Sequence, residues 1–112
     1  MKFFSAASIA VSACLPLMVL AVPGSLIYSC ENQTLSQEIV DFYAKFAKAK
    51  FVESRDIVNP DLQVTRAYKF RKNRIDYVID NYLIQIVGPQ SDIILYESSQ
   101  YGWNQCFLTV EE

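Results

Sequence analysis

Five cations occur within a short stretch of the chain, with two aromatic residues between them and no acid. The cations are Arg66, Lys69, Arg71, Lys72 and Arg74, and the aromatic residues are Tyr68 and Phe70. Lysine and arginine neutralise phosphate charges, and aromatic rings stack on bases, so this cationic stripe predicts contact with RNA or with an acidic protein surface. The alternative is an edge strand that its cations protect from sheet-to-sheet aggregation, with both rings in the core.

Proton-transfer groups are scarce in this sequence. The chain contains no histidine, which is the only side chain whose unperturbed pKa lies between pH 5 and 8. Glu97, at a predicted strand end, could give electrostatic help together with Arg66 or Arg74. Loss of an acid or base costs about 10²- to 10⁴-fold in rate. We therefore predict no catalytic residue, no metal and no cofactor, and we interpret Glu97 as a solvated strand end.

The beginning of the sequence has the pattern of a secretory signal peptide. A basic residue precedes twenty uncharged residues, and the small Ala21 suits cleavage directly after it, with Gly24 as a second cleavage position. The alternative is a membrane anchor, which Pro16 and the lack of a following basic cluster disfavour. We predict a signal peptide over residues 1–21 and one mature secreted domain over residues 22–112, without membrane contact.

Cleavage would leave an even number of cysteines. Cys14 leaves with the signal peptide, so that Cys30 and Cys106 remain. An exported chain meets an oxidising lumen, and we predict one disulfide between them, with two buried free thiols as the alternative. The crosslink would join the start of the mature chain to its end, and loop-closure entropy predicts a stabilisation of about 4–5 kcal/mol. Sulfurs that are bonded to each other supply no thiolate nucleophile.

Two further sites follow from local sequence. Residues 32–34 read Asn-Gln-Thr, an N-glycosylation sequon, so a glycan on Asn32 is one expectation, although Thr34 is also a candidate helix cap. Tyr101 and Trp103 are large aromatic residues in a polar segment just before the last cysteine. They either pack over the disulfide or form an exposed interaction hot spot.

The remaining pattern predicts one helix followed by strands. Thr34 and Gln37 form a capping box before a helix over residues 35–50. Its buried stripe would contain Leu35, Ile39, Phe42, Tyr43, Phe46 and Ala47. Strands are expected at 25–30, 62–71, 82–87, 93–96 and 105–110, with a hairpin at Gly88. The cationic stripe lies in the second of these, where alternation separates Lys69 and Arg71 from the other three cations. The predicted fold class is α+β, with a single helix packed across one antiparallel sheet.

The combination of these features resembles the RNase-like effectors secreted by powdery mildew fungi. The resemblance covers the mature chain. It is carried by the aromatic-x-cysteine triplet Tyr28-Ser29-Cys30, by the segments 81–84, 94–99 and 105–107, and by the element order. It implies a microbial ribonuclease-like fold that has lost catalysis, and delivery into plant cells, where intracellular immune receptors recognise some members.

The resemblance and the residues together predict a secreted, catalytically inactive effector. Its partners would be a host plant protein, including an intracellular immune receptor, or RNA, and its effect would be suppression of immunity. We expect a monomer. The first alternative is an active small secreted ribonuclease with a non-standard active site, and the second is an extracellular protein of the fungal surface.

Overall fold

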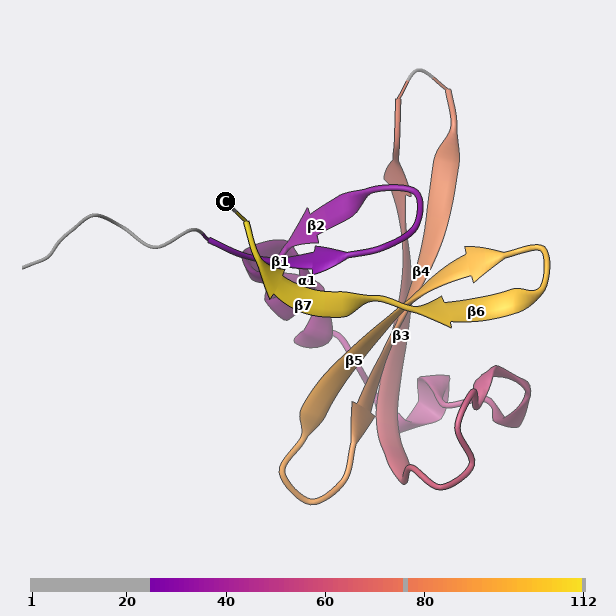
Figure 1. Ribbon diagram of the computed structural model, residues 1–112. Coiled ribbons are helices and arrows are strands. Elements are labelled where there is room, and N and C mark those ends of the chain that lie inside the picture. The colour runs from indigo at the N-terminus through magenta and orange to yellow at the C-terminus, as the bar shows by residue number, and fades with distance from the viewer. Residues whose placement is uncertain (1–24, 76, 112) are drawn as a thin grey trace, which may run out of the picture.

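The computed structural model describes residues 25–75 and 77–111, so the predicted signal peptide lies outside the described residues. The described elements begin with β1 (Leu26–Ser29), β2 (Thr34–Ser36), the α-helix α1 (Gln37–Ala44) and the 3₁₀ helices η2 (Ala49–Phe51) and η3 (Ser54–Asp56). They continue with β3 (Val64–Asn73), β4 (Ile79–Val87), β5 (Asp92–Ser99), β6 (Gly102–Gln105) and β7 (Phe107–Val110) (Figure 1). The described chain is therefore rich in strands.

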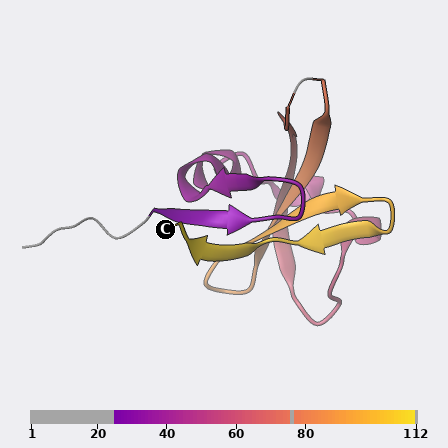
Figure 2. The ribbon, with the colours of Figure 1, turned by 45° about the horizontal axis from the view of Figure 1, so that its top comes forward.

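The strands form two antiparallel sheets rather than one. The first has the order β2-β1-β7, and the second has the order β3-β4-β5-β6. The predicted fold, a single helix across one sheet as in a microbial ribonuclease, is therefore wrong. The predicted last strand, 105–110, is interrupted at Cys106 and continues into the other sheet (Figure 2). An apolar run shows that a strand is buried, but its pairing partner is set by contacts distant in sequence.

The helix is shorter than predicted and turns a partly different face to the core. It contains eight residues, and Ser36 is its N-cap, with the Ile39 backbone N–H donating to the Ser36 hydroxyl at 3.2 Å. Thr34 belongs to β2 instead. Beyond the helix, Lys48 forms a bridge to Ala67 of β3 through two backbone hydrogen bonds of 3.1 Å.

This shift exposes part of the predicted apolar stripe. Val40 is fully buried, and Tyr43, Ala44 and Ala47 pack on the core with it. The side chains of Ile39, Phe42 and Phe46 are 36%, 53% and 43% exposed. Both sets of residues have helical spacing, so periodicity alone did not distinguish them.

The predicted central hairpin is confirmed. β4 and β5 pair with Ile84 opposite Leu95, and both strands extend beyond the predicted ranges. At the turn, Gly88 has φ +70°, in the left-handed region that glycine adopts without steric cost. The Ser91 N–H donates to the Gly88 carbonyl at 3.3 Å.

The four-stranded sheet is covered on both faces, which explains the continuous apolar run of β4. One face packs against α1 and the small sheet, and its core contains Tyr28, Leu35, Val40, Phe70, Tyr82, Ile84, Ile86, Leu95 and Cys106. The other face carries Ala67, Leu83 and Tyr96, with Val52, Ile94 and Trp103 packed against them. The connection between α1 and β3 supplies Val52 and so covers part of this second face.

Candidate functional site

The two cysteines are joined, as predicted. Cys30 follows β1, Cys106 lies between β6 and β7, and the bond spans 76 positions of sequence. Cys106 is 3% exposed and belongs to the main core, as does Tyr28, the aromatic residue of the triplet. Desolvation and then the charge of Asp41 raise the pKa of Tyr28, so its phenol stays protonated.

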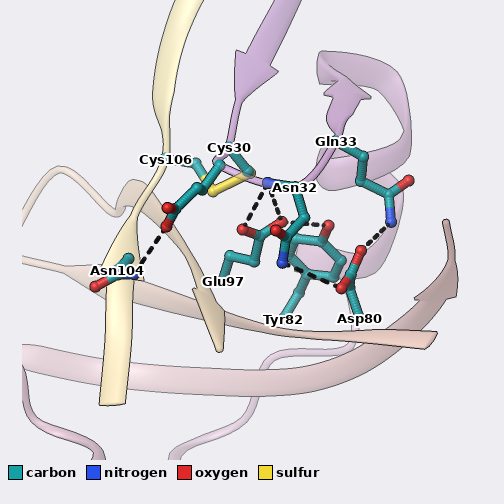
Figure 3. Close-up of a disulfide and its surroundings, with 9 residues drawn as sticks. Cys30, Asn32, Gln33, Asp80, Tyr82, Glu97, Asn104 and Cys106 are labelled. Carbon is teal, nitrogen blue, oxygen red and sulfur yellow. Dashed lines mark hydrogen bonds between the residues drawn. A yellow bond between two sulfur atoms is a disulfide. The ribbon is translucent and has the colours of Figure 1, made fainter. Parts of the chain in front are cut away.

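Beside the disulfide, Glu97 is buried and accepts hydrogen bonds (Figure 3). The Asn32 backbone N–H donates to Oε1 at 3.0 Å and Oε2 at 3.3 Å, and the Tyr82 hydroxyl donates to Oε2 at 2.8 Å. Glu97 is 2% exposed. Its interpretation as a solvated strand end was wrong because β5 continues to Ser99, which places Glu97 between β4 and β6.

A second buried carboxylate, Asp80, lies next to this group. Arg74 donates to its two oxygens at 2.7 and 3.0 Å, Gln33 Nε2 donates at 2.8 Å, and Asn32 Nδ2 donates at 3.3 Å. The hydrogen bonds from Arg74, with smaller contributions from Gln33, the Arg74 charge and Asn32, outweigh desolvation and lower the pKa of Asp80. Asp80 is therefore an anion at neutral pH.

We call Asn32, Gln33, Asp80, Tyr82 and Glu97 the polar brace. Its members link the segment after Cys30 to the β3–β4 hairpin and to β5 (Figure 3). Desolvation, followed by the hydrogen bond to Glu97, raises the pKa of Tyr82 strongly, so its hydroxyl remains a donor. The chemistry of the brace is therefore structural, because both carboxylates direct their oxygens at groups of their own chain.

The lowered pKa of Asp80 predicts acid sensitivity. A carboxyl whose folded pKa is depressed stabilises the fold fully above its unfolded pKa of about 3.9, and this stabilisation is lost as pH falls through the folded pKa. We expect Asp80→Asn to lower the free energy of unfolding near neutral pH by about 1–2 kcal/mol and to flatten its decrease below about pH 4. Urea unfolding across this pH range measures both effects.

Asp61→Asn is the matched control, because Asp61 is an exposed aspartate in the turn before β3. We expect it to keep the acid dependence of the original protein. An unchanged acid slope in Asp80→Asn would contradict the role given to this carboxylate.

The structure divides the cationic stripe between two faces. The face that the helix covers carries two of the cations with both aromatic residues, and their partners on β4 are Ile86, Ile84, Tyr82 and Asp80 for Arg66, Tyr68, Phe70 and Lys72. The opposite face carries Lys69 and Arg71, which pair with Leu83 and Asn81. Two cations are ion-paired, since Lys69 Nζ lies 2.9 Å from Asp56 Oδ2 and Arg74 pairs with Asp80. Arg66 donates to the Ser91 hydroxyl at 3.4 Å. The stripe is thus not one continuous surface.

On the face that carries Lys69, Asp56 contacts Lys69, Trp103 and Gln85. It is 6% exposed, and Trp103 Nε1 donates to its Oδ1 at 3.1 Å. Desolvation raises the pKa of Asp56, but hydrogen bonds from Lys69 and Trp103 and the charges of Lys69 and Arg55 outweigh it, so the pKa lies below its usual value. Gln85 Nε2 also donates to the Asp56 carbonyl at 2.9 Å, which fixes η3 against the sheet.

The two aromatic residues before Cys106 separate in the structure. Trp103 packs on the Ala67, Leu83 and Tyr96 cluster rather than over the disulfide. Tyr101 is 88% exposed at the β5–β6 turn. An open hollow of about 480 Å³ lies on the Trp103 face, lined by Lys69, Phe70, Arg71, Asn81, Tyr82, Ser98 and Trp103.

Sequence reasoning missed the polar brace. Its signal was Asp80, an acid inside the range that proved to be β4, together with the polar Asn32 and Gln33 two and three positions after Cys30. Asn32 remains exposed while its Nδ2 donates to Asp80. Glycosylation of Asn32 stays a prediction.

Among residues 25–75 and 77–111, no group of three histidine, cysteine, aspartate or glutamate side chains could hold a metal ion. Within the same described ranges, no helix has both the length and the apolar character needed to cross a bilayer. In comparisons with known proteins, no protein-family model and no curated protein matches this chain.

Proposed function

We propose that this protein is a secreted effector of a plant-pathogenic fungus that acts by binding a host macromolecule and performs no catalysis. The observation that carries the non-catalytic part is the environment of Glu97. A general base must reach the proton that it abstracts within about 2.6–3.2 Å. Glu97 is 2% exposed, and its oxygens accept bonds from Asn32 and Tyr82. It is therefore unsuited to meet a substrate hydroxyl.

The effector class is supported by the sequence resemblance and not by the fold. Export through the predicted signal peptide accounts for a disulfide, which forms in oxidising compartments. The buried position of Cys106 in the main core restricts access of reductants to the bond. After entry into a host cell, the disulfide of such a protein would be reduced more slowly than an exposed disulfide. The protein would there suppress immunity or be recognised by an intracellular receptor.

RNA is the second candidate partner, because the hollow combines Lys69 and Arg71 with the indole of Trp103. Cations and an aromatic ring are the groups that hold single strands. Of the two cations that line this hollow, Lys69 is ion-paired, and Arg71 has no ion-pair partner among the described residues. An arginine with one ring makes a smaller site than the extended grooves of single-strand binders, so we favour a host protein.

The proposal is tested by expressing residues 22–112 without the signal peptide in leaf cells, alone and with a panel of cereal immune receptors. We expect suppression of a defence response, or cell death with one receptor. A chain that does neither would contradict the effector proposal.

A parallel assay adds the purified oxidised protein to single-stranded RNA. We expect no cleavage and weak, salt-sensitive retention that Arg71→Glu reduces. Cleavage that Glu97→Gln abolishes, in a variant shown to be folded, would establish the ribonuclease alternative instead.

A further inference from the structure

The β3–β4 hairpin ends in an exposed apolar tip. Ile75 is 69% exposed, Tyr77 is 99% exposed, and Val78 and Ile79 are 47% and 48% exposed. The hairpin extends beyond the other elements of the fold (Figure 1). Soluble monomers seldom gather large apolar side chains on a projecting element, and such patches mark interaction sites.

Two backbone hydrogen bonds join the described residues on the two sides of the tip. The Arg74 N–H donates to the Val78 carbonyl at 2.8 Å, and the Val78 N–H donates to the Ile75 carbonyl at 3.2 Å. Below the tip, the polar brace holds Asp80 and Tyr82 of β4 against the segment that follows the disulfide. A contact element that is already held in position loses less conformational entropy on binding.

The charged side chains of β3, which leads into the tip, are all basic. Arg71 is exposed and Lys72 is half-buried on the adjoining part of β3, and neither has an ion pair among the described residues. A complementary partner would therefore have an apolar cleft for the tip and acidic residues around that cleft. Tyr77 has the side-chain type that dominates interface hot spots.

Resting on the proposed binding function, we infer that the tip formed by Ile75, Tyr77, Val78 and Ile79 is the contact element for a host protein, and that it enters an apolar cleft with an acidic rim. A lipid surface fits less well, because the sequence places Asp76 between Ile75 and Tyr77 and a carboxylate is costly in hydrocarbon. RNA fits less well because the three aliphatic side chains cannot stack on bases as aromatic rings do.

The experiment uses the oxidised protein secreted from the full chain, with a photo-crosslinking phenylalanine analogue at position 77 or, as the matched control, at position 101. Tyr101 is 88% exposed against 99% for Tyr77, and the sequence offered it as an interaction hot spot. An adduct from position 101 would therefore assign the contact to the β5–β6 turn instead of the tip. Irradiation in leaf extract should give a covalent adduct to a host protein from position 77 and not from position 101.

The captured protein is then purified, and its affinity for three variants is measured. We expect Tyr77→Ser to weaken binding at least tenfold, Arg71→Glu to weaken it and reduce its salt dependence, and Tyr101→Ser to leave it unchanged. Thermal unfolding should be the same for both tyrosine variants, because neither side chain is buried.

Several outcomes would overturn the inference. One is equal crosslinking from positions 77 and 101, and another is a Tyr77→Ser variant that binds the captured protein as tightly as the original protein does. The others are an adduct between two copies of this chain, and Tyr77-dependent binding to phosphatidylserine vesicles or to single-stranded RNA. The leaf assay separates the two proposals. If the original protein changes the host response and Tyr77→Ser does so equally, only the tip assignment fails. If the original protein has no effect on the host, the effector proposal fails and the tip assignment fails with it.

Discussion

Replacing Cys30 and Cys106 together by alanine should lower the free energy of unfolding by about 4–5 kcal/mol, as judged from the loop that the disulfide closes. The bond joins positions separated by 76 residues, so its loss frees almost the whole described chain in the unfolded state. Domains of this size have a net stability of about 5–15 kcal/mol, so the loss would be a large share of it. Urea unfolding of both proteins at neutral pH measures the difference.

A reductant provides the internal control for this prediction. Dithiothreitol should shift the unfolding midpoint of the original protein toward that of the double alanine variant and should leave the variant itself unchanged. A shift of the variant would show that reduction acts elsewhere. A difference below about 1 kcal/mol would contradict the role of the crosslink, since removing a native disulfide from a small secreted domain typically costs about 2–5 kcal/mol.

Glu97→Leu should lower the free energy of unfolding by about 3 kcal/mol. The leucine side chain is apolar and accepts no hydrogen bond, so the Asn32 N–H and the Tyr82 hydroxyl lose their buried acceptor. Each unsatisfied buried donor costs about 1–3 kcal/mol. Glu97→Gln should cost about half as much, because its carbonyl oxygen still accepts one of these bonds.

The Tyr82→Phe variant measures how much of the decrease in the free energy of unfolding comes from the 2.8 Å hydrogen bond between the phenol and Glu97. We expect the phenylalanine variant to lose about 1–2 kcal/mol, and the double variant with Glu97→Gln to lose less than the sum of the single changes. Strict additivity would show that the two side chains do not interact. A Glu97→Leu protein as stable as the original would show that the polar brace is dispensable.

The extent of β5 explains why Glu97, which sequence reasoning had placed in solvent, is 2% exposed in the structure. In an extended strand, Glu97 follows Tyr96, and successive side chains point to opposite faces. Tyr96 belongs to the cluster with Ala67 and Leu83, so Glu97 must point to the face that the disulfide and the helix cover. A strand end at Tyr96 would have left Glu97 in solvent. Pairing with β6 to Ser99 placed it inside the sheet.

Several features of this protein were determined by the sequence alone. The pair of cysteines that remains after the predicted cleavage predicted the disulfide, and the apolar runs around Gly88 predicted the β4–β5 hairpin. The alternation in β3 placed Lys69 and Arg71 on the opposite face from Tyr68 and Phe70. These features depend on covalent pairing, on turn chemistry and on a side-chain period of two, which are all local.

The tertiary structure decided the rest. It separated Cys106 from the predicted last strand and paired β7 with β1. It also ended the helix at Ala44 and bridged Lys48, four residues later, to β3. It also brought Asp80 and Glu97 to the segment after Cys30. Each of these outcomes is a contact between residues far apart in the chain. Such contacts depend on which buried groups satisfy one another's hydrogen bonds, and no local pattern of residue types carries that information.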